Sequence, residues 1–278
     1  MASKRPEHLG PPELFYDETE SQKYSSNSHI IAIQAEMTER AMELLALPED
    51  NSALILDVGC GSGLSGEVVT DAGHMWIGMD ISLPMLNVAV EREVSGDLIL
   101  KDMGHGVPFK AGTFDGAISI SALQWLCHAN ASDQNPRKRL LRFFQSLYAS
   151  LARGARAVFQ FYPENSDQSE LITQQAVKAG FSGGLVIDFP NSSKAKKVFL
   201  VLMTGGPQQL PKGLSEESGS HHVANAGRRT FAMASRDKKG KPSKGSRAWI
   251  ESKKERARKQ GKDVKESSKY TGRKRRRL

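Results

Sequence analysis

The sequence predicts an α/β fold built on a mostly parallel β-sheet, followed by a strongly basic tail. Strand-like apolar runs alternate with helical stretches between about residues 53 and 179, which is typical of a parallel sheet. The last two strand-like runs, 184–188 and 197–202, are separated by only eight residues. A parallel crossover needs a dozen or more residues, so these two strands should be antiparallel neighbours. Beyond residue 206 the composition changes to Lys, Arg, Ser and Gly.

The first helix is expected after an acidic lead-in, residues 1–27, which is rich in turn-forming residues and which we expect to act as a lid. Residues 28–47 should be helical, because apolar side chains such as Ile33, Met37 and Leu44 recur near helical spacing and Pro48 ends the pattern. The lead-in and this helix precede the alternating region.

The alternating elements then follow in order. Strands are expected at 53–58, 75–80, 97–101, 114–120 and 155–161, and helices at 64–72, from Pro84 onward, at 136–151 and at 168–179. Pro84 suits the first turn of a helix, and Gly154 should close the helix at 136–151. With the antiparallel pair at 184–188 and 197–202, the sheet has seven strands and the folded domain spans residues 28–206.

The charge is divided unevenly along the chain. The whole sequence has 39 Lys+Arg and 31 Asp+Glu, but residues 207–278 alone hold 22 basic and 7 acidic residues, a net charge of +15. Residues 1–206 are therefore acidic, with a net charge of −7. Low hydrophobicity combined with high charge predicts that residues 207–278 are disordered in isolation.

Composition also excludes several classes of protein. No apolar run approaches the roughly 20 residues that a membrane helix requires, and no apolar stretch follows the charged N-terminus as in a secretory signal. The sequence has two cysteines, Cys60 and Cys127, which cannot make a disulfide framework or a four-ligand zinc site. We therefore expect an intracellular protein with no membrane association and no metal site of its own.

The most specific motif is a glycine-rich turn between the first strand of the alternating region and the next helix. It reads Asp57-Val58-Gly59-Cys60-Gly61-Ser62-Gly63. Glycines in such a turn let a ligand approach the backbone. A dinucleotide-binding loop would have its third Gly or Ala one position later, where this chain has Leu64. Taken alone, the motif could also be a simple strand-to-helix corner.

Further acidic residues follow the next two strands. Asp80 ends the strand at 75–80, where a carboxylate can accept both hydroxyls of a ribose. Asp102 and Met103 follow the strand at 97–101, where an acid could meet an adenine amino group and Met103 could pack on the ring. Each Asp could instead be a solvated strand end or a helix cap. Three acids at the carboxyl ends of three successive strands indicate a nucleotide-like ligand.

These residues resemble the motifs of class I S-adenosylmethionine-dependent methyltransferases. The resemblance implies the sheet order 3-2-1-4-5-7-6 of that Rossmann-like fold, with an antiparallel last strand. It also implies S-adenosylmethionine as the cofactor. The cofactor-binding residues expected from it are Tyr24, Asp57, Gly59, Cys60, Gly61, Gly63, Asp80, Ile81, Asp102, Met103 and Ser119.

A narrower resemblance covers nearly the whole chain. The strings 11–16 (PPELFY), 24–28 (YSSNS), 76–82 (WIGMDIS), 119–127 (SISALQWLC) and 268–275 (SKYTGRKR) are similar to the 18S ribosomal RNA (guanine-N7) methyltransferases of eukaryotes. This family resemblance implies methylation of a guanine in 18S rRNA within pre-40S ribosomal particles, together with some role in ribosome assembly. It also implies a heterodimer with a small zinc-binding activator subunit.

Two regions are expected to meet the partners. Tyr16, Gln124 and Trp125 are expected to contact the guanine. Trp125 could instead be a core residue, and Tyr16 and Tyr24 could be packing residues. In the implied sheet order, the strand at 97–101 lies at an edge, where an apolar strand can pair with another chain. We expect the activator to pair there, along Leu98, Ile99 and Leu100.

The chemistry predicted for this site requires no general base. Guanine N7 carries a lone pair and no proton, so the enzyme must mainly align and hold the reactants. The basic tail is expected to bind RNA phosphates and to carry a nuclear localisation cluster. That cluster is formed by Arg273, Lys274, Arg275, Arg276 and Arg277.

Two alternative functions remain open from the sequence. A methyltransferase acting on a small molecule or a protein would share all the cofactor motifs, although the basic tail argues against it. The chain could also act chiefly as a ribosome assembly factor in which methylation is secondary.

Overall fold

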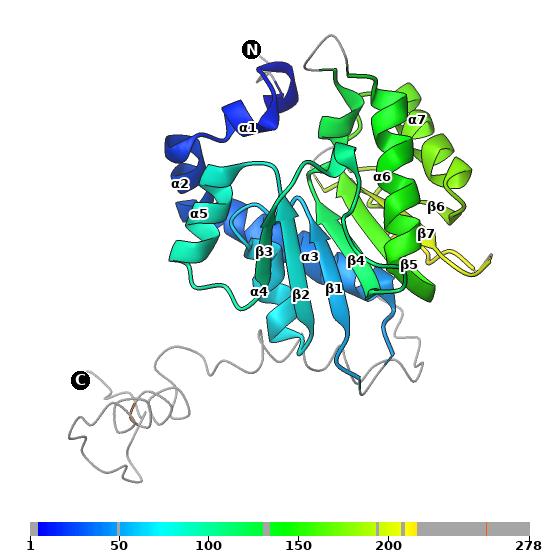
Figure 1. Cartoon of the computed structure of the whole chain (residues 1–278), viewed down its shortest axis with the longest axis horizontal. Coiled ribbons are helices and arrows are strands. Elements are labelled where there is room, and N and C mark those ends of the chain that lie inside the picture. The colour runs from blue at the N-terminus through cyan, green and yellow to red at the C-terminus, as the bar shows by residue number, and fades with distance from the viewer. Residues whose placement is uncertain are drawn as a thin grey trace, which may run out of the picture. The chain divides into compact units, whose positions relative to one another are not determined.

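The computed structural model describes residues 5–48, 51–129, 134–192, 195–206, 209–215 and 254. The chain divides into two compact units, Met1–His221 and His222–Leu278, and Lys254 is the only described residue of the second. The first unit is an α/β structure with helices on both faces of a sheet (Figure 1). Among the described residues, every helix is too short or too polar to cross a bilayer.

The sheet has seven strands in the order β3-β2-β1-β4-β5-β7-β6. Strands β1 to β5 are parallel neighbours, and β7 pairs antiparallel with both β5 and β6. The fold, the strand order and the antiparallel end of the sheet predicted above are thereby confirmed. The strands are β1 (Leu54–Val58), β2 (Met75–Asp80), β3 (Asp97–Leu100), β4 (Phe114–Ile120), β5 (Leu151–Phe161), β6 (Ser182–Asp188) and β7 (Lys197–Met203).

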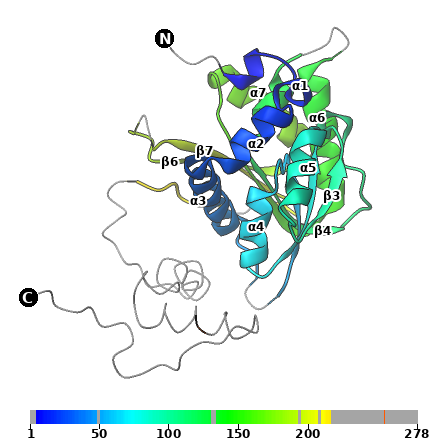
Figure 2. The ribbon, with the colours of Figure 1, turned by 90° about the vertical axis from the view of Figure 1, so that its left-hand side faces the viewer.

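Helices form two layers around the sheet (Figure 2). One core contains Phe143 and Phe144 of α6 with Ile172 of α7, packed on one face of the sheet. The other contains side chains of α3, α4 and α5 on the opposite face, including Leu44 and Val69. These helices are α3 (Ser28–Leu45), α4 (Leu64–Asp71), α5 (Leu83–Glu91), α6 (Pro136–Ser150) and α7 (Ser166–Lys178).

Side-chain caps account for where several helices begin. The Asn27 side chain accepts from the backbone N–H groups of His29 and Ile30, and Asn165 accepts from Gln168 at the start of α7. Such caps satisfy N–H groups that have no partner inside the helix. Helix α3 ends at Leu45, and its C-cap Ala46 adopts a left-handed conformation two residues before Pro48.

The lead-in region is more regular than its turn-rich sequence suggests. It forms η1 (Pro6–His8), α1 (Pro12–Phe15) and α2 (Glu18–Ser26), and the Asp17 side chain caps α2 by accepting from Glu20 N–H. Helix α2 lies against α5 (Figure 2). The Ser82 hydroxyl donates to the Tyr16 carbonyl at 3.0 Å, and Arg5 donates to the Tyr162 carbonyl at 2.9 Å. These bonds attach the N-terminal segment, residues 5–27, to the core.

The boundary between α6 and β5 differs from the prediction. We expected a helix to residue 151 closed by Gly154, with the strand beginning at 155. Instead, α6 ends at Ser150 and β5 begins at once at Leu151. Gly154, at φ +86°, lies inside the strand, and the pairing register with β4 shifts between Phe114 and Gly116. The glycine therefore accommodates an irregular strand and does not end a helix.

A short segment, residues 209–215, packs against the far edge of the sheet. Leu214 N–H donates to Asp188 Oδ1 at 2.8 Å, and Phe189 N–H donates to the Leu214 carbonyl at 2.7 Å. Arg40 joins this contact, because its guanidinium donates to Asp188 and to the Lys212 carbonyl. The start of the segment assigned above to the tail is thus bound to the folded domain.

Candidate functional site

An open cavity lies at the carboxyl ends of the strands, with about 1040 Å³ of empty space when the solvent in its mouth is included. Open α/β sheets bind ligands at this edge. Its wall combines the glycine-rich turn after β1, the end of β2, the residues after β3 and β4, and the N-terminal segment. Most predicted site residues line it: Tyr16, Tyr24, Gly59, Cys60, Gly61, Asp80, Ile81, Asp102, Met103 and Trp125.

Backbone geometry explains the glycines of the turn. Gly59 has φ +74°, and a Cβ atom there would lie 2.3 Å from Ala122 Cβ. Gly61 has φ +53°, and its Cβ position has no neighbour closer than Met85 Cε at 3.8 Å. Close packing against Ala122 thus excludes any side chain at position 59. At position 61 the space beside the backbone is open, and Gly61 lines the cavity.

Asp80 organises the turn from the next strand. Its Oδ2 accepts from Gly61 N–H at 2.8 Å and its Oδ1 accepts from Ser82 N–H at 2.8 Å. Burial raises the pKa of Asp80, and these backbone hydrogen bonds partly oppose that shift. Each carboxylate oxygen has a second lone pair, so Asp80 can still accept hydroxyl groups of a ligand.

Asp57 lies behind the turn and is not among the residues that line the cavity. Its side chain is fully buried; one oxygen accepts from the Ser65 hydroxyl, and Oδ1 has no hydrogen-bond partner among the described residues. Burial raises its pKa to about 7, and the Ser65 hydrogen bond partly opposes the rise. A buried acceptor without a partner is costly, and a bound donor would relieve that cost.

Asp102 has a partner that the sequence did not reveal. Both its carboxylate oxygens accept from Arg139 Nη2, at 2.8 and 2.9 Å, and Oδ1 also accepts from Gly104 N–H. Arg139 lies on α6 and itself lines the cavity. Because the two residues are 37 positions apart, no local pattern predicts the pair. The adenine-site assignment of Asp102 stays a prediction, and the structure adds a cation beside it.

Four aromatic rings form one cluster between the N-terminal segment and the segment after β4. The ring centroid of Trp125 lies 6.1 Å from Phe15 and 6.0 Å from Tyr16, and Tyr16 lies 5.9 Å from Tyr24. Trp125 is 6% exposed, so it is both a packed residue and part of the cavity wall. Burial raises the pKa of both tyrosine hydroxyls, which therefore stay protonated at neutral pH.

Three other predicted residues do not line the cavity. Gly63 forms the N-cap of α4, Ser119 is fully buried within β4, and Gln124 donates to the Ser121 carbonyl at 2.7 Å. The structure instead brings Ser121 to the wall, with an unusual φ of +60°. The Ser121 hydroxyl also bonds to Gln160 at 2.8 Å. A serine held in this sparsely populated conformation is typical of functional sites, but nothing local in the sequence marks it.

The predicted partner strand is at an edge of the sheet. Strand β3 pairs only with β2, and along it Leu98 and Ile99 are half-buried while Leu100 is 54% exposed. Its free side faces no other described strand.

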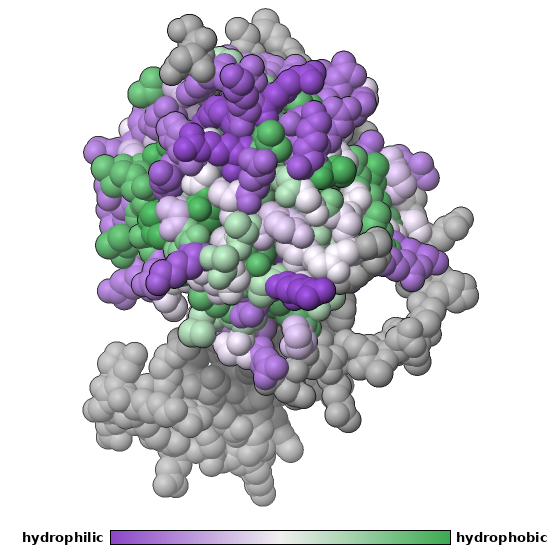
Figure 3. All heavy atoms as spheres, turned by 45° about the vertical axis from the view of Figure 1, so that its right-hand side comes forward, coloured by the Kyte–Doolittle hydropathy of each residue, from purple (hydrophilic) through white to green (hydrophobic). Residues whose placement is uncertain are grey.

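The nuclear localisation cluster, Arg273 to Arg277, lies outside the described residues. Figure 3 shows hydrophilic side chains gathered toward the end of the molecule to which the parallel strands point.

Comparison with known proteins identifies relatives of nearly equal length. The family model described as "Methyltransferase domain" matches residues 56–159, and that described as "Methyltransferase involved in Williams-Beuren syndrome" matches residues 202–277. A Dictyostelium discoideum protein named "Probable 18S rRNA (guanine-N(7))-methyltransferase" is 57% identical, over 98% of each chain. A Mus musculus protein named "18S rRNA (guanine-N(7))-methyltransferase" is 56% identical, over 98% of this chain and 97% of its own.

A solved structure supports the fold independently. The Haemonchus contortus phosphoethanolamine N-methyltransferase 2, solved with phosphomonomethylethanolamine and S-adenosylhomocysteine, matches with a TM-score of 0.54 at 17% identity. The match covers 69% of this chain and 58% of that one. At this identity the likeness concerns the fold alone.

Proposed function

The chain belongs to the family of 18S rRNA (guanine-N7)-methyltransferases, and on this premise we propose that it methylates N7 of a guanine in 18S ribosomal RNA. The observation that carries the proposal is the identity of more than half the residues over 98% of the chain. The methyl donor is S-adenosylmethionine. The cavity at the strand ends is the place in the described structure where donor and base would meet.

The residues at the cavity fit the methyl donor. Asp80 presents lone pairs for ribose hydroxyls, and the Gly59–Gly61 turn exposes backbone to the cavity. Met103 and Met85 offer apolar surface in the same cavity. S-adenosylmethionine, when bound, supplies a methyl group on a positively charged sulfur. The carboxylate of Asp80 suits that charge better than a basic wall would.

The protein's own contribution to the reaction is positioning. Guanine N7 attacks through a lone pair and loses no proton, so no side chain needs to act as a base. Holding two reactants in line can lower a barrier by roughly 7–11 kcal/mol. Trp125 and Tyr16 line the cavity and can stack on the guanine, while their packing on Phe15 fixes the ring positions. Tyr16 and Tyr24 remain neutral and can act as hydrogen-bond donors.

The decisive test compares two glycine-to-arginine substitutions. Gly61→Arg places a long side chain at the cavity wall, whereas Gly73→Arg places it at an exposed turn with nothing within 4 Å. Both positions have positive φ, +53° and +88°, so the backbone strain is matched in kind. We expect Gly61→Arg to abolish N7-methylguanosine in 18S rRNA, mapped by borohydride and aniline cleavage, and Gly73→Arg to retain it.

The outcomes separate the alternative functions. If the modification persists with Gly61→Arg, the assignment of the methyl-donor site to this cavity is wrong. If the modification is lost but small-subunit maturation is normal, methylation and any assembly role are separate. If purified protein methylates a small molecule or a protein but no 18S rRNA, the substrate proposal fails while the methyltransferase activity stands.

A second chain is part of the proposal. The free edge of β3 and the exposed Leu100 support pairing with a small zinc-binding activator subunit. The zinc of that heterodimer would belong to the activator. The proposal rests on the sheet edge and on the family resemblance.

The basic tail extends the proposal to location and substrate binding. Residues 207–278 carry a net charge of +15, which suits binding to RNA phosphates and offsets the acidic charge of residues 1–206. The cluster Arg273–Arg277 has the composition of a nuclear localisation signal. Nuclear location, with passage through the cytoplasm on pre-40S particles, and a role in ribosome assembly are the proposals that these features support.

A further inference from the structure

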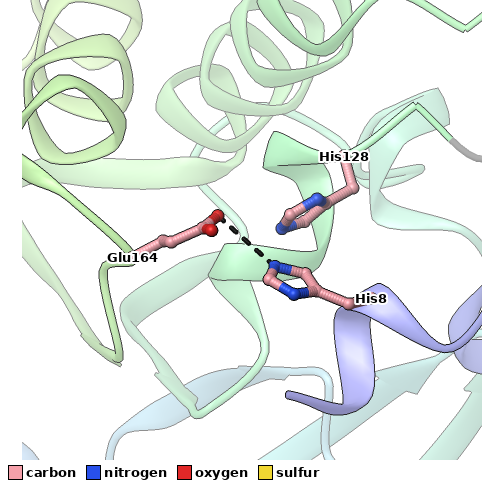
Figure 4. A group of neighbouring side chains, drawn as sticks. All are labelled: His8, His128 and Glu164. Atoms are coloured by element: carbon pink, nitrogen blue, oxygen red, sulfur yellow. Dashed lines mark ion pairs between the residues drawn. The ribbon is translucent and has the colours of Figure 1, made fainter. Parts of the chain in front are cut away.

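Three side chains of metal-binding type converge where the N-terminal segment meets the core. They are His8, His128 and Glu164 (Figure 4). His8 comes from η1, His128 follows the short helix η3 (Leu123–Cys127), and Glu164 lies in the loop between β5 and α7. One ligand atom of each lies within 4.8 Å of the other two. None of the three lines the cavity described above.

Their geometry is close to that of a metal site. His8 Nε2 lies 3.4 Å from Glu164 Oε2. Ligands of a tetrahedral zinc ion stand about 3.3–3.4 Å apart, as Zn–N distances of about 2.0–2.1 Å require. The centroids of the two imidazole rings are 5.3 Å apart and the ring planes meet at 67°, so the rings are edge-on and not stacked. One pair of ligand atoms is thus already at the required spacing, and the ligand atom of His128 lies within 4.8 Å of both.

A second observation points to a missing ligand. Nε2 of His128 is buried and has no hydrogen-bond partner among the described residues. Figure 4 shows a ring nitrogen of His128 directed toward the space between His8 and Glu164. A buried polar atom without a partner needs an explanation, and an unplaced ion is one of the standard explanations.

We propose that His8, His128 and Glu164 bind a divalent transition-metal ion and that this ion fastens the N-terminal segment to the core. Two imidazoles and one carboxylate form a donor set that suits Zn²⁺, with water as the fourth ligand. Because the ligands come from three separate parts of the chain, binding is coupled to their association.

The consequence for the fold is specific. Without the ion, the described contacts of the N-terminal segment include Arg5 with the Tyr162 and Pro163 carbonyls and Ser82 with the Tyr16 carbonyl. Through His8 and His128, the ion would join η1 to the end of η3, the short helix that carries Trp125. It therefore acts as a structural clasp beside the aromatic cluster and takes no part in methyl transfer.

The test measures metal binding directly on the full chain, prepared without a histidine tag and stripped with EDTA. We expect titration calorimetry to find one Zn²⁺ site, and Co²⁺ to give the absorption bands of a site with nitrogen and oxygen ligands. His8→Ala and His128→Ala should each weaken that site by more than about tenfold. His29→Ala is the matched control, because His29 is an exposed helical histidine outside the cluster.

A second readout reports on the clasp itself. Zn²⁺ should slow proteolytic cleavage within residues 5–27 several-fold in the wild type and in His29→Ala, and leave it unchanged in His8→Ala. Thermal unfolding in EDTA should be the same for all forms, which shows that the variants are folded. Zinc binding that survives in both cluster variants, or that is absent from the wild type, overturns the proposal and leaves a hydrogen-bonded cluster.

Discussion

Asp57 is a buried acid, and the ionised form of its side chain destabilises the folded protein. Burial raises its pKa from the ordinary 3.8 to about 7. Between these values the folded protein keeps a proton that the unfolded chain has released. Its contribution to stability is therefore most favourable below about pH 4 and declines as the pH rises to about 7. Above about pH 7, the free energy of unfolding is lower by on the order of 4 kcal/mol than it would be with an unshifted Asp57.

Asp57→Asn should remove this penalty. In the absence of methyl donor, we expect the variant to gain free energy of unfolding relative to wild type as the pH rises from about 4.5 to 7.5, because Asn carries no charge. Urea unfolding at a series of pH values measures the difference. Asp71→Asn, at an exposed position at the end of α4, is the control and should show no comparable trend. A pH-independent difference for Asp57→Asn would contradict the assigned cause.

Single residues also show where sequence reasoning stops. The position of Gly59, Gly61 and Asp80 at the cavity could be predicted, because a glycine turn and strand-end acids form patterns along the chain. The Asp102–Arg139 pair could not, since it depends on how α6 packs over the end of β3. Ser121 could not either, because its hydrogen-bond partner Gln160 is 39 positions away and no local pattern marks its positive φ.

At the scale of elements, the edge strand β3 allows a direct test of the activator proposal. Burying an exposed apolar side chain contributes roughly 1.5–3 kcal/mol, so Leu100→Glu should weaken the heterodimer by about tenfold or more. Co-purification with the activator subunit measures this. Leu185→Glu, on the opposite edge strand β6 and 37% exposed, is the matched control. Equal losses in both variants would mean that β3 is not the specific interface.

Most elements followed from periodicity, and the exceptions have physical reasons. The antiparallel pair β6–β7 could be predicted from a connection too short for a crossover. The start of β5 could not, because Gly154 has the same sequence signal whether it ends a helix or lies in an irregular strand. Helices α1 and α2 were missed because α1 is a single turn and α2 is highly polar. The Asp17 cap and the contacts with α5 stabilise α2, and neither forms a periodic apolar pattern.

For the whole molecule, the opposed charges of body and tail predict how RNA binding responds to salt. Replacing Arg273, Lys274, Arg275, Arg276 and Arg277 with glutamine should weaken RNA binding and lower the slope of log affinity against log salt by up to about 4. Filter binding of an 18S rRNA fragment at several salt concentrations measures the slope. An unchanged slope would show that these five charges do not contact phosphates.

The order of strands in the sheet also bears on synthesis. Strand β7 is the last strand of the sheet to be translated, yet it lies between β5 and β6, and most of its residues are fully buried. Until residue 203 has left the ribosome, β5 has no neighbour on that side and β6 has no place in the sheet. An unpaired apolar edge of this kind invites association with other chains. Nascent copies stalled before residue 197 should therefore depend on chaperones more than copies stalled after 215.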